Sequence, residues 1–278
     1  MEKIRRNERM SAMMKLLSGA PNRIFTLSSF CELFGSAKST MSEDVDLLRE
    51  VCREFDLGTV ETVTGAAGGV RYRPAVSRKK ALEYITELCG RLSGAERVLP
   101  GGFLYYSDIL STPDIVNRMG EIIASEYAES GADFVLTMET KGIPVAFATA
   151  NALGIPLVIA RHSSKVYEGS AVNINYVSGS GSIETMSLSR RAVKENQRAL
   201  IVDDFLKGGG TAKGMVELMR EFSVTVAGMA FVMATVTPEK KRISGEKSLM
   251  TLSVTEGEPA EAVVKPAEWL LEDLQNKT

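Results

Sequence analysis

The residues best suited to chemistry lie between positions 203 and 211. Asp203 and Asp204 follow the apolar run 199–202, and Gly208–Gly210 precede Thr211. Glycines let backbone amides approach a phosphate closely, and the start of the helix expected at Thr211 adds a positive partial charge. Adjacent carboxylates accept hydrogen bonds from neighbouring hydroxyls and repel a phosphate placed on top of them. This order predicts a site for a phosphorylated sugar at the C-terminal end of a buried strand.

A second polar loop, Glu139–Gly142, follows the apolar run 134–138. Thr140 and Gly142 can offer amides and Lys141 a charge to a diphosphate, with Mg²⁺ expected to bridge diphosphate and ribose oxygens. The alternative for both loops is an ordinary strand, turn and helix with solvated acids. Two acids directly after an apolar strand favour the ligand site.

The elements that must position these loops alternate along the C-terminal part of the chain. The pattern predicts a helix after Pro113 and then, in order, strand 134–138, helix 143–153, strands 156–160 and 199–202, helix 211–222 and strand 224–236. Short apolar strands between helices indicate a parallel sheet covered on both faces, so the predicted class is α/β. The alternating segments 171–177 and 183–189 predict a hairpin flap.

The N-terminal quarter has a different pattern. Helices are predicted over 5–17 and 27–34, and a third, capped by Ser39 or Thr40, carries the apolar stripe Met41, Val45, Leu48, Cys52 and Phe55. Segments 59–64 and 70–73 alternate around a glycine-rich tip and predict a hairpin. Three helices followed by a hairpin are the order of a winged helix-turn-helix domain. The predicted domains are therefore 1–74 and 75–278.

In such a domain the start of the third helix faces DNA. The predicted DNA-binding residues are Ser36, Lys38, Ser39, Thr40 and Ser42, with Arg71 on the wing. Because acids nearly balance bases in this quarter, positive charge must gather on one face; the candidates are Arg5, Arg6, Arg9, Lys38, Arg71 and the run 78–80. Glu43 and Asp44 are expected in the first turn of the helix. Protein binding or dimerisation is the alternative use of this domain.

Composition excludes several classes of site and protein. The chain has 278 residues, 44% hydrophobic, with a net charge of −2 and only one histidine, His162, so a His-pair mechanism or a His-rich metal site is excluded. Three cysteines without metal spacing indicate reduced thiols. The absence of a long apolar run or an export signal predicts a cytoplasmic protein that does not enter membranes.

These motifs resemble a known family. Segment 199–211 resembles the signature of type I phosphoribosyltransferases. The chain as a whole is similar to the bacterial purine operon repressors, which join a winged helix to a phosphoribosyltransferase-like domain. The resemblance rests on Ser36-Ala37-Lys38-Ser39, Gly65-Ala66-Ala67-Gly68-Gly69-Val70, Leu99-Pro100-Gly101-Gly102, Thr140-Lys141-Gly142-Ile143-Pro144, Asn175-Tyr176-Val177-Ser178-Gly179-Ser180 and Asp203-Asp204-Phe205. Gly208 stands where relatives often have alanine, which should only loosen the loop.

The resemblance implies a homodimeric repressor of purine biosynthesis and transport genes that binds double-stranded operator DNA. It also implies that 5-phosphoribosyl 1-diphosphate (PRPP), with Mg²⁺ and no required cofactor, relieves DNA binding, and that purine nucleotides such as guanosine alarmones compete for the pocket. The implied effector-binding residues are Asp203 and Asp204 for ribose, Lys207, Gly208, Gly209, Gly210 and Thr211 for the 5′-phosphate, Thr140, Lys141 and Gly142 for the diphosphate, and Phe103 or Phe205 against a base.

Two other functions are weighed against this one. An active purine phosphoribosyltransferase needs a base pocket and a closing flap, for which Arg161 and Lys165 lie near the predicted hairpin. An adaptor could sense the ligand and bind a protein rather than DNA. The winged helix favours a regulator, so we expect no enzyme and assign no catalytic residue.

Overall fold

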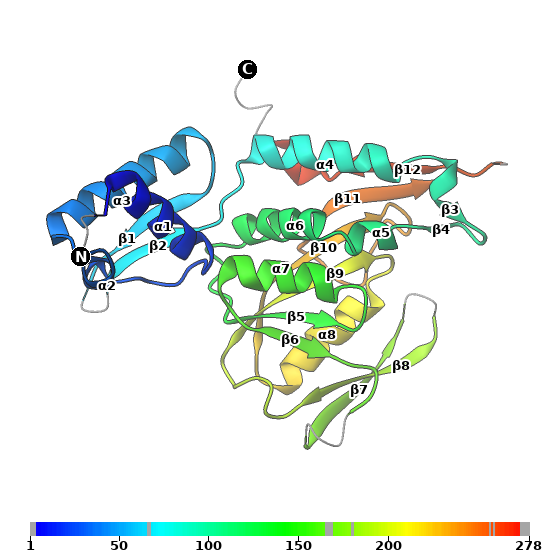
Figure 1. The fold of residues 1–278 in the computed structure, drawn as a ribbon. Helices are drawn as coiled ribbons and strands as arrows, with labels where there is room; N and C mark the ends of the chain where they lie inside the picture. The colour runs from blue at the N-terminus through cyan, green and yellow to red at the C-terminus, as the bar shows by residue number, and fades with distance from the viewer. Residues whose placement is uncertain are drawn as a thin grey trace. The chain divides into compact units, whose positions relative to one another are not determined.

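The computed structural model describes residues 4–65, 68–164, 169–178, 181–255, 257 and 259–272. It divides into two compact units: Met1–Ser77 with Asn151–Gly154, and Arg78–Ala150 with Ile155–Thr278. Figure 1 labels the elements of both units. Each unit has its own hydrophobic core and is described by itself.

The N-terminal unit consists of three helices and a hairpin. They are α1 (Arg6–Ser18), α2 (Leu27–Phe34), α3 (Lys38–Glu54) and the antiparallel pair β1 (Thr59–Val63) and β2 (Gly69–Arg73). All five elements contribute buried side chains to one core, made of Met13, Leu17, Phe30, Phe34, Met41, Val45, Leu48, Cys52, Val60 and Val70. The predicted order of a winged helix is confirmed, although the tip residues 66 and 67 lie outside the described residues.

Helix α3 differs in detail from the prediction. It begins at Lys38, with Ala37 as an N-cap that makes no side-chain cap, so neither predicted capping residue caps it. Asp44 therefore lies beyond the first turn, and it is fully buried. Phe55 is 59% exposed because it follows the last residue of α3, so it does not extend the buried stripe.

The second unit is built on a six-stranded sheet of order β12-β11-β10-β9-β5-β6. Its strands are β5 (Phe134–Met138), β6 (Leu157–Ala160), β9 (Arg198–Leu206), β10 (Thr225–Thr235), β11 (Glu246–Val254) and β12 (Ala262–Pro266). Neighbouring strands are parallel except β12, which pairs antiparallel with β11. The predicted parallel sheet is thus confirmed with one antiparallel edge strand added, and β11 and β12 were not predicted.

Helices cover both faces of this sheet (Figure 1). Those of the unit are α4 (Arg78–Leu92), α5 (Ser107–Leu110), α6 (Pro113–Glu126), α7 (Ile143–Leu153) and α8 (Gly210–Glu221). From β5 the chain crosses through α7 to β6, and from β9 it crosses through α8 to β10, in the opposite direction along the sheet. Since such crossovers are right-handed, α7 and α8 lie on opposite faces.

Smaller elements surround the sheet. The predicted hairpin is present as β7 (Ala171–Val177) and β8 (Ile183–Ser189), and it packs on α8. A short hairpin of β3 (Val98–Leu99) and β4 (Phe103–Leu104) precedes α5, and 3-10 helices of the described residues span Ala95–Arg97 and Glu268–Leu270.

Candidate functional site

The topology opens a crevice between β5 and β9. Strand β9 pairs with β5 only as far as Ile201, whereas it stays paired with β10 to Leu206. This longer pairing corrects the predicted end at 202 and places Asp203 and Asp204 within the strand. In open α/β sheets ligands bind where the strand order reverses, at the carboxyl ends of the strands. The loops after β5 and β9 meet at that point.

The two acids at the crevice have different surroundings. Asp203 is only 7% exposed. Burial and the neighbouring Asp204 charge raise the pKa of Asp203 well above its ordinary value. The Asp204 amide donates to Asp203 Oδ1 at 3.0 Å, and the Tyr106 hydroxyl donates to Asp204 Oδ2 at 2.5 Å. The pair therefore presents acceptor oxygens and favours partners that donate hydrogen bonds or carry positive charge.

The loop after β5 is shaped around the same carboxylate. A Cβ on Gly142 would stand 1.9 Å from Asp203 Oδ1 and 2.6 Å from Thr137 Oγ1, so only glycine fits there. Glu139 accepts hydrogen bonds from the His162 amide at 2.7 Å and from Arg161 at 3.3 Å. These contacts hold the start of the loop to Arg161 and His162, which directly follow strand β6.

The glycines after β9 have three different roles. Gly209 is the N-cap of α8 with a φ of 79°, in the left-handed region that favours glycine. A Cβ on Gly210 would stand 2.0 Å from the Val177 carbonyl oxygen, so this glycine admits the end of β7. A Cβ on Gly208 would meet nothing within 4 Å. The loop thus requires two of its glycines, and alanine at the third would fit.

Two openings meet at the crevice. The larger, about 940 Å³, is bounded by the β3–β4 hairpin, the loop after β9 and the ends of β10 and β11. The smaller, about 450 Å³, lies on the hairpin side between the loop after β5 and β8. Asp203, Lys141, Phe205 and Thr211 line both. An extended ligand can therefore reach from one opening into the other.

The structure brings the predicted ligand residues together. Phe103, Lys207, Gly208, Gly209 and Gly210 line the larger opening, and Thr140 and Asp204 line the smaller. Gly142 lies against Asp203, as described above. Lys165, considered for a base pocket, lies outside the described residues, as do hairpin-tip residues 179 and 180.

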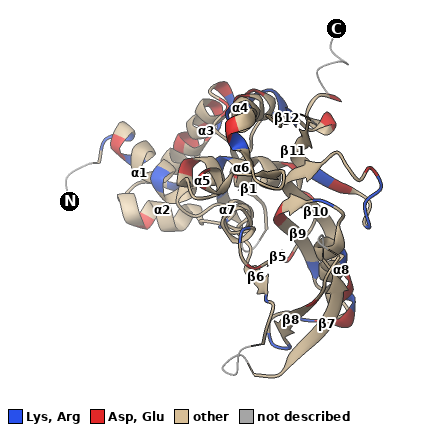
Figure 2. Ribbon diagram, turned by 90° about the vertical axis from the view of Figure 1, so that its right-hand side faces the viewer, with Lys and Arg blue, Asp and Glu red and all other residues tan. Residues whose placement is uncertain are grey.

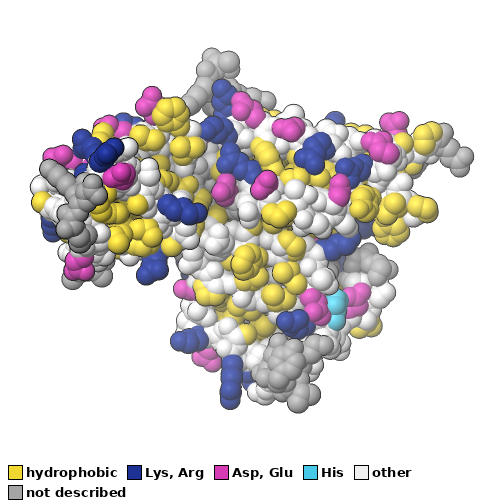
Figure 3. Space-filling view, viewed as in Figure 1, with side chains coloured by type: hydrophobic (Ala, Val, Ile, Leu, Met, Phe, Trp, Pro, Cys, Tyr) yellow, Lys and Arg dark blue, Asp and Glu magenta, His cyan; other side chains and the backbone are white. Residues whose placement is uncertain are grey.

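Two residues of the site were missed in the sequence. Tyr106 bonds Asp204, stacks on Phe205 with ring centres 5.9 Å apart, and lies 5.0 Å below the Lys141 ammonium. No local motif marks Tyr106. His162, used above only to exclude a His-pair mechanism or a His-rich metal site, lines the smaller opening, 3.8 Å from Glu184. Figure 3 shows this histidine beside acidic side chains.

A metal at this site would need the ligand's help. Among the described residues, no group of three or more His, Cys, Asp or Glu side chains could hold a metal ion. Mg²⁺ commonly takes one or two carboxylates and completes its shell with phosphates and water. Asp203 and Asp204 fit that partial role.

The predicted DNA-facing residues cluster at the start of α3. Lys38, Ser39 and Ser42 are exposed, and Thr40 is half-buried. Ser36 is half-buried and donates to the Phe34 carbonyl at 3.3 Å. Lys38, Ser39 and Ser42 are therefore available at the N-terminal end of α3, the end that a winged helix-turn-helix domain places against DNA.

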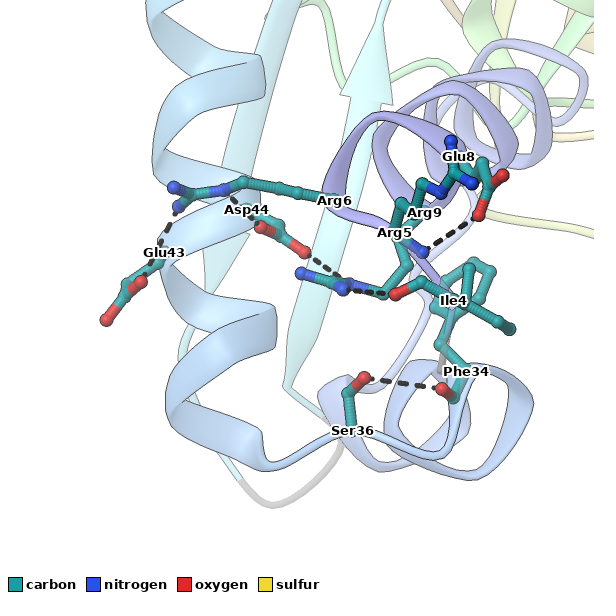
Figure 4. A network of polar contacts seen from close by, with 9 residues as sticks. All are labelled: Ile4, Arg5, Arg6, Glu8, Arg9, Phe34, Ser36, Glu43 and Asp44. Atoms are coloured by element: carbon teal, nitrogen blue, oxygen red, sulfur yellow. Dashed lines mark hydrogen bonds and ion pairs between the residues drawn. The ribbon is translucent and has the colours of Figure 1, made fainter. Parts of the chain in front are cut away.

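Less positive charge is available in the N-terminal unit for binding DNA than the sequence suggests. Arg9 is buried and paired with Asp44 at 2.9 Å, and Arg6 bonds the other oxygen of the same carboxylate (Figure 4). On the wing, Glu61 binds both Arg71 and Arg73. Arg9 is therefore excluded from a DNA-facing set, because its charge stabilises the contact between α1 and α3.

The basic run 78–80 was also a candidate for the DNA-facing charge, but its first residue has a structural role in the second unit. Arg78 opens α4 in the second unit, where it pairs with Glu126 at 3.2 Å and lies over the Trp269 ring. It thus holds α4 to the unit that carries the sheet. No helix in the described ranges is long and apolar enough to cross a membrane.

Comparison with known families gives two matches. Residues 5–74 match the family described as bacterial purine repressor, N-terminal, and residues 105–265 match the phosphoribosyl transferase domain. An adenine phosphoribosyltransferase structure from Saccharomyces cerevisiae covers 59% of this chain and 97% of its own, with a TM-score of 0.52 at 18% identity. This likeness confirms the predicted phosphoribosyltransferase fold for the second unit.

Curated relatives match both parts of the chain together. A probable purine biosynthesis transcriptional regulator, PurR, of Streptococcus pneumoniae serotype 4 is 44% identical over 253 residues, 90% of this chain and 92% of the relative. A purine biosynthesis transcriptional activator, PurR, of Lactococcus lactis subsp. lactis is 41% identical over 248 residues, 89% of this chain and 92% of the relative. The similarity to regulators thus extends beyond either domain alone.

Proposed function

Because the chain belongs to the bacterial purine repressor family, we propose that it is a cytoplasmic repressor of purine biosynthesis and transport genes. Residues 1–74 bind operator DNA, and residues 75–278 bind PRPP, which relieves DNA binding. The observation that carries the effector half is the crevice at Asp203. There, sugar-binding acids, a glycine loop and a helix start converge at one topological switch point.

Each part of PRPP has a matching group in the crevice. Asp203 and Asp204 accept hydrogen bonds from the ribose hydroxyls, and the acceptor oxygens described above support this role. Lys207 and the loop to Thr211 bind the 5′-phosphate through a positive charge, backbone amides and a hydroxyl. Thr140, Lys141 and Gly142 face the diphosphate. Mg²⁺ bound with PRPP would offset the repulsion between its phosphates and the acids.

The larger opening extends beyond the sugar. Phe103 and Phe205 line it together with Phe231, Leu252 and Val254. Such a surface suits a planar base, so purine nucleotides, guanosine alarmones among them, compete with PRPP for the crevice. This apolar part of the larger opening then recognises the base of a competing nucleotide. The chain acts as a regulator and not as an enzyme.

On the DNA side, Lys38, Ser39 and Ser42 contact the operator directly, together with Ser36, Thr40 and the wing residue Arg71. The exposed start of α3 supports this assignment. A homodimer presents two such helices to two half-sites. Sedimentation of the protein with and without operator DNA tests the dimer.

Fluorescence anisotropy with labelled operator DNA tests the coupling. Affinity should fall when PRPP and Mg²⁺ are added, because effector and DNA influence each other reciprocally. The double variant Asp203→Ala, Asp204→Ala should bind DNA as tightly as the wild type and no longer respond. An unchanged DNA affinity on adding PRPP to the wild type would refute the proposal.

Whether the chain represses or activates transcription needs its own assay, because the family description says repressor whereas the Lactococcus relative is named an activator. A reporter gene behind a purine promoter should rise in a deletion strain and fall again on complementation.

Incubation with PRPP and purine bases tests for transferase activity. Formation of nucleotide and pyrophosphate would show an enzyme and contradict the regulatory assignment of the second unit.

A further inference from the structure

A hollow lined by basic side chains lies beside the loop after β9. Its volume is about 370 Å³, and among the residues that line it are Ser178, Gly181, Lys207, Gly208, Gly210, Lys240 and Arg242. We call it the basic hollow. Three of its residues are cationic, and none of the described residues that line it is acidic. Such a surface favours an anion with more than one negative charge.

The loop between β10 and β11 builds this hollow. The Arg242 amide donates to the Gly208 carbonyl at 3.0 Å, and its guanidinium donates to the Val177 carbonyl at 3.2 Å. These bonds join the loop to both the glycine turn and the hairpin. Figure 2 shows the basic residues of this loop next to one another.

The three cations of the loop are used differently. Lys241 Nζ donates to the carbonyl oxygens of Thr235 and Pro238, each at 2.7 Å, so it holds the loop's own backbone. Lys240 and Arg242 are exposed and line the hollow. The acids Glu239 and Glu246 line a neighbouring depression and not the hollow itself. Lys241 is thus committed to the loop's own backbone, whereas Lys240 and Arg242 face both the hollow and the neighbouring depression.

The hollow adjoins the proposed 5′-phosphate site. Lys207, Gly208 and Gly210 line both the hollow and the large opening. A phosphate bound at this turn therefore has a cationic surface on its far side. A second phosphate attached to the first would move toward Lys240 and Arg242, away from the acids at 203 and 204.

We infer that the basic hollow is an accessory phosphate site, which takes the second phosphate of a nucleoside 5′-diphosphate. This inference rests on the proposed function, because it assumes that the first phosphate lies at residues 207–211. The site then distinguishes nucleotides by the number of phosphates at the 5′ position. PRPP has a single 5′-phosphate and leaves the hollow unused, so the hollow favours competing nucleotides over the inducer.

Titration calorimetry of the full chain with AMP, ADP, GMP and GDP tests the inference. The measured quantity is the ratio of diphosphate to monophosphate affinity for each base, which cancels general effects of a substitution on folding or on the base pocket. We expect this ratio to be about tenfold in the wild type, as one charge-assisted hydrogen bond supplies. Lys240→Ala should bring it close to one, and Lys240→Arg should preserve it.

Lys194→Ala is the matched control, since Lys194 is exposed and lies outside the hollow; its ratio should equal that of the wild type. Equal ratios in the wild type and Lys240→Ala would overturn the inference alone, provided that the monophosphates bind. A ratio that falls with Lys141→Ala instead would place the extra phosphate at the loop after β5 and also overturn it. Binding of neither nucleotide class, with PRPP still bound, would overturn the inference alone, whereas loss of PRPP binding as well would overturn the proposed function.

Discussion

Replacing Gly142 with alanine tests whether the crevice is built around the Asp203 carboxylate. The new Cβ would stand 1.9 Å from Asp203 Oδ1 and 2.6 Å from the Thr137 hydroxyl, far inside contact distance. Because Thr137 lies within the buried strand β5, the carboxylate has to move. A hydrogen bond to a charged group contributes about 1.5–3 kcal/mol. The Kd for PRPP should therefore rise between about tenfold and about a hundredfold.

Titration calorimetry with PRPP and Mg²⁺ measures this change, and Gly208→Ala is the matched control from the facing loop. A Cβ on Gly208 meets nothing within 4 Å, and its backbone does not require glycine, so its affinity should equal that of the wild type. Thermal unfolding of both variants checks that each is folded at the assay temperature. A folded Gly142→Ala protein that binds PRPP as tightly as the wild type would show that Asp203 does not hold the ligand.

Three further predictions concern charge. Burial and the Asp204 charge raise the pKa of Asp203 above its ordinary 3.8, so its ionisation removes stability as the pH rises from that value through the raised one. Asp203→Asn should then raise the melting temperature at neutral pH, measured by calorimetry, and abolish the response to PRPP. Asp44→Ala leaves the buried Arg9 unpaired and should destabilise the N-terminal unit by about 3–5 kcal/mol in denaturant titrations, whereas exposed Glu43→Gln should cost less than about 1 kcal/mol. Lys38→Ala should weaken DNA binding in anisotropy titrations for all sequences alike and lower the salt slope by about 1.

Much of the ligand site could be predicted because its signals are local. The acids and glycines of 203–211 follow directly from one strand, and the loop 139–142 follows from another. Parallel strands end at the same edge of a sheet, so the predicted sheet puts both loops at one edge, and the structure makes them meet because β5 and β9 are neighbours. The helix boundaries followed from apolar spacing in the same way, to within a few residues.

Partners that are distant in the sequence could not be predicted. Tyr106 reaches Asp204 across 98 positions, and no motif near Tyr106 announces the contact. Arg9 was counted as available positive charge, but its carboxylate partner lies 35 positions away on another helix. A count of charged residues shows their sum and not their pairing, which depends on how elements pack. Strand β12 was missed because Lys265 and Pro266 interrupt its short apolar run, and a proline disfavours the prediction of a strand.

The hydrogen bond from Tyr106 to Asp204 has a consequence for sugar selectivity. The phenol takes only part of the acceptor capacity of Asp204, so a sugar hydroxyl can donate to the same carboxylate beside Tyr106. A deoxyribose lacks one hydroxyl and leaves the corresponding acceptor position of the carboxylate without a donor. Sites that recognise a hydroxyl through buried polar groups reject analogues that lack it strongly. The protein should therefore distinguish ribonucleotide precursors from deoxyribose phosphates.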